Sequence, residues 1–159
     1  MTDLPQEYFD KLYQQSDDPW GFEDRFYERR KRELLLAILP RTRFARGFEP
    51  GCSTGALSAG LAGRCDELTA WDVSWRALEQ ADSRSLGNVS FELKAFPEQR
   101  PEGLFDLVVI SEMGYYVGDL GELVRAVDEV LTEDGVLVAC HWRHPAPGYP
   151  QTAEAVHAA

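Results

Sequence analysis

The stretch that most constrains this chain is Glu49–Gly55, which reads Glu-Pro-Gly-Cys-Ser-Thr-Gly. The segment 43–48 before it reads as a short strand, and the small-residue segment 54–62 after it reads as a helix, which predicts a strand, a turn and a helix. Gly51 and Gly55 lack a Cβ, so the backbone can turn sharply and a flat ligand can lie against it. A helix that begins at this turn points free N–H groups toward such a ligand. The stretch therefore predicts a cofactor site.

Asp72 supports this interpretation. It ends the next apolar run, 21 positions after Gly51, where a doubly wound sheet places the acid that binds both ribose hydroxyls. A dinucleotide site would need the spacing G-x-G-x-x-G, whereas the chain has G-x-x-x-G with Ser53 in the middle position. Glu49 would also repel a pyrophosphate and suits a ligand with an amino group and a sulfonium charge. These features count against an NAD-dependent oxidoreductase.

Strand and helix patterns alternate after the turn, which predicts a parallel sheet with crossover helices. The strands are expected at 44–49, 67–72, 89–94, 105–111 and 135–142, and the helices at 54–63, 75–83 and 119–131. Glu133-Asp134-Gly135 is expected to form the turn that closes the last of these helices. Before the sheet, two helices are expected, the first with an aromatic face and the second from Phe22 to Leu39.

Two sets of motifs resemble known families. The run from Glu49 to Gly55, Asp72 and the run from Phe105 to Glu112 resemble the class I S-adenosylmethionine-dependent methyltransferases. Within that class, further motifs of this chain resemble the NodS-like (nodulation protein S) family. They are Asp18-Pro19-Trp20, Tyr27-Glu28, the run 111–116 and His141-Trp142-Arg143-His144-Pro145. The resemblance covers nearly the whole chain from about Tyr8 onward.

This resemblance implies a Rossmann-like α/β fold with helices on both faces of the sheet. It implies S-adenosylmethionine as cofactor, S-adenosylhomocysteine as product, and methyl transfer to a small-molecule acceptor, preferably an amine such as an amino sugar. One domain is expected, with a helical lid at 1–40, the cofactor-binding α/β core at 41–145 and the start of a C-terminal helix at 146–159. The class normally adds two further strands, and their absence here predicts an uncovered sheet edge that invites a protein partner or self-association.

The residues expected at the cofactor follow the predicted strands or belong to the lid. Ala95 stands where the class often has an acid for the adenine amino group, so backbone groups around Phe96 are expected to serve instead. In the lid, Trp20 and Tyr27 either cover the cofactor or belong to the core, and one of Arg25, Arg30, Lys31 and Arg32 is expected to meet the cofactor carboxylate unless the run is a solvated face. The full set expected at the cofactor is Trp20, Tyr27, Glu49, Gly51, Cys52, Gly55, Asp72, Val73, Ala95, Phe96 and Ser111.

Three residues are expected to act in catalysis. Glu112 is placed to hydrogen-bond an acceptor amine and take its proton, provided that burial raises its pKa. Tyr115 is expected to stack on the acceptor, and His144 is a candidate base. The structural alternative makes Glu112 a hydrogen-bonding acid of the scaffold, Tyr115 a wall residue and His144 a residue without a catalytic part.

Composition narrows the remaining choices. The formal net charge of −11 argues against a nucleic-acid partner, which needs clustered Lys and Arg. The three cysteines form no C-x-x-C pair, so no metal site is expected. No apolar run approaches the length of a membrane span, and the cytoplasm is the expected compartment. The alternative to an enzyme is a module that holds the cofactor without turnover and docks on a partner chain.

Overall fold

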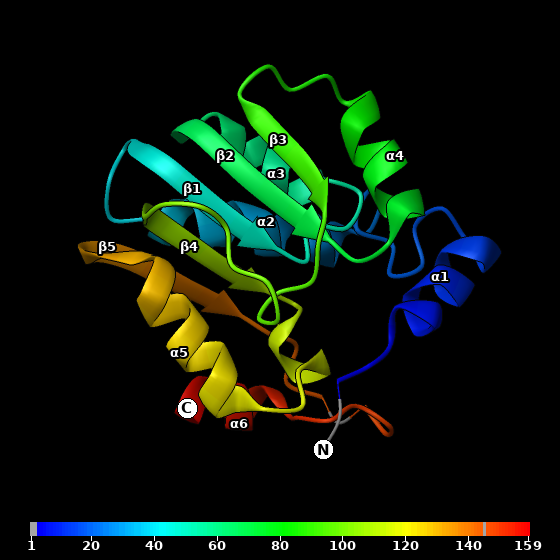
Figure 1. Cartoon of the computed structure of the whole chain (residues 1–159). Helices are drawn as coiled ribbons and strands as arrows, with labels where there is room; N and C mark the ends of the chain where they lie inside the picture. Colours follow the sequence, from blue (N-terminus) through cyan, green and yellow to red (C-terminus); the bar gives the residue numbers. More distant parts are fainter. Residues whose placement is uncertain (1–2, 145) are drawn as a thin grey trace.

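Five parallel strands form the centre of the computed structural model, which describes residues 3–144 and 146–159. Their order across the sheet is β3-β2-β1-β4-β5 (Figure 1). The strands are β1 (Phe44–Pro50), β2 (Cys65–Asp72), β3 (Val89–Leu93), β4 (Phe105–Ser111) and β5 (Leu131–Cys140). This is the doubly wound α/β fold that the sequence predicts.

Helices cover both faces of the sheet. In Figure 1, α2 and α3 lie behind the sheet and α5 lies in front of it, while α1 lies on the side toward which the strand arrows point. The helices are α1 (Gln6–Gln15), α2 (Phe26–Ile38), α3 (Ala56–Ala62), α4 (Trp75–Ser83), α5 (Leu120–Val130) and α6 (Ala153–Ala158), with a 3-10 turn, η1 (Gly114–Tyr116). The predicted lid thus corresponds to α1, α2 and the segment between them.

The central strands are held by burial and by one polar clamp. Leu107, Val108 and Val109 of β4 are fully buried, as expected for a strand covered on both faces. Asp106 interrupts this apolar run, and its carboxylate accepts hydrogen bonds from the backbone N–H groups of Ala45 (2.9 Å) and Arg46 (2.8 Å). Asp106 therefore ties the start of β1 to β4.

The order of the strands fixes where a ligand can bind. The chain runs outward from β1 through β2 to β3, and then returns to the other side of β1 with β4. The crevice of an open α/β sheet lies at the carboxyl ends of the two strands where this order reverses. The segments after β1 and β4 therefore flank the expected crevice.

Two helices begin two or more residues later than the sequence predicts. The second helix starts at Phe26 rather than Phe22, because the Asp18 carboxylate accepts the backbone N–H groups of Phe22 (2.8 Å) and Glu23 (2.9 Å) and holds this segment in a turn. Helix α3 starts at Ala56 rather than Thr54, because Gly55 has a left-handed backbone with φ of 75°.

The last strand differs most from its prediction. The prediction that Glu133-Asp134-Gly135 forms a turn at the end of the preceding helix is wrong, because these residues lie within β5, which runs from Leu131 to Cys140. Leu131 pairs with Phe105 and Val136 pairs with Leu107, so segment 132–135 faces a single residue of β4 and bulges out of the ladder. The polar sequence marks this bulge and not the end of α5.

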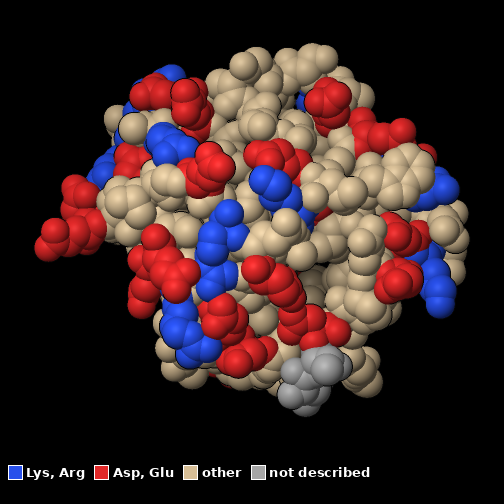
Figure 2. All heavy atoms as spheres, viewed as in Figure 1, with Lys and Arg blue, Asp and Glu red and all other residues tan. Residues whose placement is uncertain are grey.

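The surface charge, the helices and the possible metal ligands of the described residues bear on the predictions made from composition. On the face in Figure 2, basic side chains lie among acidic ones and do not gather into one basic patch. Within residues 3–144 and 146–159, no helix is long and apolar enough to cross a membrane. In the same ranges, no group of three or more His, Cys, Asp or Glu residues is arranged to hold a metal ion. The predicted domain limits at residues 1 and 145, and Pro145 of the last motif, fall outside the described residues.

Candidate functional site

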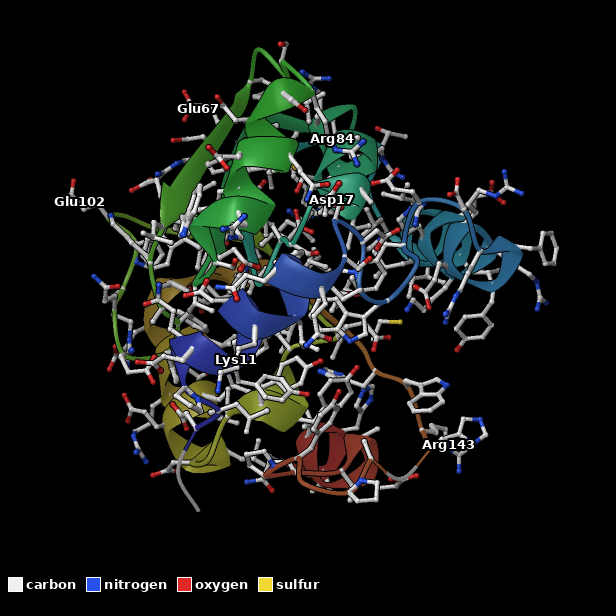
Figure 3. All side chains as sticks on the ribbon, turned by 90° about the vertical axis from the view of Figure 1, so that its right-hand side faces the viewer. Lys11, Asp17, Glu67, Arg84, Glu102 and Arg143 are labelled. Carbon is white, nitrogen blue, oxygen red and sulfur yellow. The ribbon has the colours of Figure 1, made fainter. Side chains whose placement is uncertain are left out.

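A cavity of about 360 Å³ lies at the carboxyl ends of β1, β2 and β4. Figure 3 views the molecule from this side, with α1 crossing in front of the sheet and α2 beside it. The lid contributes Phe9, Tyr13, Trp20 and Phe22 to the wall. The volume lies within the usual range for small-molecule and cofactor sites. The predicted lid segment and the strand ends thus line one ligand-sized space.

The glycine turn forms one side of this cavity. Gly51 has φ of 73°, and the backbone N–H groups of Gly51 and Cys52 donate to the Trp71 carbonyl at 2.7 and 2.9 Å. A Cβ on Gly51 would lie 2.9 Å from the Cβ of Met113, so only glycine allows the turn to pack against the segment after β4. Cys52 is buried in the wall.

Asp72 lies next to this turn. Its Oδ2 atom accepts the backbone N–H of Ser53 at 2.8 Å, and its Oδ1 atom accepts that of Ser74 at 2.9 Å. Burial raises the pKa of Asp72, while the backbone N–H groups of Ser74 and Ser53 lower it. Each oxygen keeps a further lone pair, so the carboxylate can still accept hydroxyl groups from a ligand in the cavity. Val73 also lines the wall.

Glu49 is buried at the end of β1, and its Oε2 atom accepts the Ser58 hydroxyl at 2.6 Å. Burial raises the pKa of Glu49 to about 8, and the nearby Asp72 carboxylate acts in the same direction. A buried carboxylate without a cation is unfavourable, so a positively charged ligand group would stabilise its ionised form.

The wall after β3 contains both expected residues and two that the sequence reasoning missed. Ala95 and Phe96 line the cavity, but the Ala95 backbone N–H donates to the Gln99 side chain at 2.9 Å. Lys94 and Glu98 line the same wall. They follow the third strand, and residues at the carboxyl end of a parallel strand are candidates for a ligand site, so the sequence could have identified them.

Glu112 lies on the other side of the switch point, after β4. Its φ of 58° is unusual for a residue with a side chain, and such strain tends to occur at functional sites. Its Oε1 atom accepts a hydrogen bond from Lys31 at 2.9 Å, and its Oε2 atom accepts one from the Tyr115 hydroxyl. Ser111 lies beside it in the wall. Burial and the Glu112 carboxylate raise the pKa of Tyr115, so this hydroxyl keeps its proton.

Several predicted residues lie elsewhere. Tyr27 is 53% exposed and does not line the cavity, although α2 presents Glu28, Lys31 and Arg32 to it. Gly55 is not in the wall either and instead shapes the turn. Of the four basic lid candidates, Lys31 and Arg32 line the cavity, and Arg25 and Arg30 are exposed.

His144 is exposed and is not brought together with Glu112. It lines a separate hollow of about 170 Å³ with Tyr115, Trp142 and Tyr149. His141, which precedes it, accepts the Gly114 backbone N–H at 3.0 Å and contacts His157 of α6. Burial lowers the pKa of His141 to about 4, so this ring is neutral and supports η1.

Comparisons with known proteins agree with this geometry. Residues 6–146 match the family model described as Nodulation protein S (NodS). Nodulation protein S of Rhizobium tropici is 34% identical over 119 residues, which cover 73% of this chain and 50% of the relative. The chain thus spans about half the length of the curated relatives it matches.

Two solved structures are similar over most of the chain. A putative methyltransferase from Pseudomonas syringae is 46% identical with a TM-score of 0.73, and the match covers 84% of this chain and 83% of that one. The N-methyltransferase NodS from Bradyrhizobium japonicum WM9, solved in complex with S-adenosylhomocysteine, is 31% identical with a TM-score of 0.75. That match covers 84% of this chain and 71% of the other.

Proposed function

Because this chain belongs to the Nodulation protein S (NodS) family, we propose that it is an S-adenosylmethionine-dependent methyltransferase that acts on a small-molecule amine. One observation carries the proposal: a single cavity has Glu49 and Asp72 on one side and Glu112 on the other. The first pair suits the cofactor, and Glu112 suits an acceptor that loses a proton. An amino sugar is the acceptor class that we propose.

The residues of the cavity fit S-adenosylmethionine chemically. Glu49 is a buried carboxylate with a raised pKa, which calls for a cationic partner such as the amino group of this cofactor. Asp72 faces the cavity with free lone pairs that can accept ribose hydroxyls. Apolar and aromatic residues, among them Trp20 and Phe96, supply most of the remaining wall.

When bound, S-adenosylmethionine would supply an activated methyl group for the acceptor nitrogen, with its sulfur as the leaving group. The chain has a positioning task, because alignment of two bound reactants can supply a large part of the acceleration in such a transfer. Aromatic lid residues such as Trp20 and Phe22 line the cavity and are expected to exclude water from the bound ligands. Glu112 accepts an N–H hydrogen bond from the acceptor and then its proton.

Calorimetric titration tests the cofactor part of the proposal. The chain is expected to bind S-adenosylmethionine and S-adenosylhomocysteine with micromolar affinity, because two buried carboxylates and the glycine turn are already arranged for them. Asp72→Ala should abolish this binding. Asp66→Ala, which changes an exposed carboxylate paired with Arg43, is the matched control and should bind like the unchanged chain. Equal affinity in all three proteins would contradict the assigned site.

The acceptor is tested with pairs of compounds that differ only in the nucleophile. Glucosamine and its short oligosaccharides are compared with the corresponding compounds that carry a hydroxyl in place of the amine, and S-adenosylhomocysteine formation is measured. Turnover with the amines alone supports the proposal, whereas turnover with the hydroxyl compounds refutes the amine part. Tight cofactor binding without turnover on any member of the panel would favour the cofactor-binding module.

A further inference from the structure

Lys31 forms a largely buried charged cluster with two glutamates. Its Nζ atom lies 2.6 Å from Glu28 Oε2 and 2.9 Å from Glu112 Oε1. The side chains of Lys31, Glu28 and Glu112 are only 14%, 11% and 13% exposed, and all three line the main cavity. Glu28 and Lys31 lie one turn apart on α2, and Glu112 follows β4. The cluster therefore joins the lid to the acceptor side of the sheet.

The charges of this cluster do not cancel. Two carboxylates and one ammonium group leave one negative charge in a poorly solvated wall. The Glu28 Oε2 atom makes its ion pair with Lys31 but no well-aligned hydrogen bond. Removal of one partner from a buried ion pair leaves an uncompensated charge, which is strongly unfavourable. Removal of Lys31 would thus leave the Glu112 carboxylate without its cation.

The position of Glu112 is determined from three directions. Lys31 holds one carboxylate oxygen and the Tyr115 hydroxyl holds the other. The backbone N–H of Glu112 donates to the Cys140 carbonyl at 2.8 Å while the residue keeps a positive φ. Such a combination fixes a side chain that has to meet a ligand in one orientation. Of these three contacts, the one with Lys31 also places a positive charge next to the Glu112 carboxylate.

We propose that Lys31 is a positioning residue, which fixes the Glu112 carboxylate toward the acceptor amine and keeps it ionised, with Glu28 holding Lys31 in place. This rests on the proposed function, in which Glu112 accepts the proton of the amine. Lys31 therefore acts through Glu112, and the cofactor carboxylate is not its partner. The ammonium group also lies 5.7 Å from the ring centre of Phe22 and 5.6 Å from that of Tyr27, so the lid completes its surroundings.

The groups that face Glu112 define the expected pH effect. They are Glu28 and Lys31 on α2, Tyr115 on η1 and the Cys140 thiol at the end of β5. Without the ammonium group, Glu112 and Glu28 become neighbouring carboxylates with no cation between them. Two carboxylates placed so close together disfavour the ionisation of each other. Activity that needs ionised Glu112 should then require a higher pH.

The first experiment measures kcat/KM for the amine against pH in the unchanged chain, Lys31→Met and Lys31→Arg. Lys31→Met should move the acidic midpoint upward by about one pH unit or more, with affinity for S-adenosylmethionine changed less than about threefold. Lys31→Arg should restore the profile, since it keeps the charge. Lys11→Met, which changes an exposed residue on α1 (Figure 3), should behave like the unchanged chain. Loss of cofactor affinity with an unchanged profile would overturn the proposal.

A second experiment decides the matter even if no acceptor is found. The sequence contains three lysines, Lys11, Lys31 and Lys94, so their side-chain NMR signals can be titrated individually in the whole chain. Burial alone would lower the pKa of Lys31, but the carboxylates of Glu112 and Glu28 raise it on balance. Glu112→Gln should therefore lower the pKa of Lys31 and leave that of Lys11 unchanged. An unaltered Lys31 titration would contradict the link, whatever the outcome of the activity assays.

Discussion

At the scale of single residues, Gly51 shows how a missing side chain shapes the site. Gly51→Ala should destabilise the chain by about 1–3 kcal/mol, because alanine strains the positive φ and its Cβ would press on Met113. Gly87→Ala is the matched control, since Gly87 has open space around its position and no positive φ. It should be neutral or slightly stabilising. Urea unfolding of both variants measures the difference, and equal losses would contradict the explanation.

Glu49 provides a second prediction at this scale. Its pKa in the folded chain is about 8, above the ordinary value, so the folded state binds more protons than the unfolded state between about pH 4.5 and 8. Glu49 therefore makes stability fall as pH rises through this window, by up to about 1.4 kcal/mol per pH unit. Glu49→Gln should remove that part of the slope. Urea unfolding across the window checks it, and an identical slope in the variant would argue against the assigned pKa.

At the scale of elements, the carboxylate of Asp106 is the clamp between β1 and β4. Asp106→Ala should cost about 2–4 kcal/mol, because two backbone N–H groups lose a charged acceptor. Asp66→Asn changes only an exposed pair with Arg43 and should cost less than about 1 kcal/mol. Thermal unfolding followed by circular dichroism compares the two. A loss at Asp106 no larger than that at Asp66 would show that the strands do not depend on this clamp.

At the scale of the whole molecule, the segment from Leu4 through α1 joins the two sides of the cavity. The Leu4 backbone N–H donates to the Tyr116 carbonyl at 3.0 Å, while Tyr13 hydrogen-bonds Ser53 at the glycine turn. S-adenosylhomocysteine should therefore slow hydrogen exchange in 6–15, because a ligand in the cavity stabilises the closed lid. Helix α5, which does not line the cavity, is the internal control. If S-adenosylhomocysteine slowed hydrogen exchange in α5 alone, or in neither helix of the unchanged chain, the result would argue against the lid.

Particular residues explain how far the sequence predicted this structure. The sheet and its cavity followed from Gly51, Asp72 and the apolar strand at 105–111, because local spacing determines them. The cluster of Glu28, Lys31 and Glu112 did not follow, since it pairs residues 81 positions apart whose contact depends on how α2 docks. The bulge at 132–135 was not predicted either, because its polar residues are equally compatible with a turn. The roles of Tyr115, Tyr27 and His144 stay predictions.

The reversal of strand order between β1 and β4 has a consequence for how such a chain can change. Glu49, Asp72 and Phe96, which are assigned to the cofactor, lie at or after the carboxyl ends of β1, β2 and β3, whereas Glu112 and η1 follow β4. Helix α6, whose His157 contacts His141 beside η1, follows β5. Apart from the N-terminal lid, which contributes to both, the two halves of the cavity are thus encoded by separate stretches of sequence. New acceptor preferences can evolve, or be engineered, by exchange of the second stretch while the first, together with Glu28 and Lys31 of the lid, is retained.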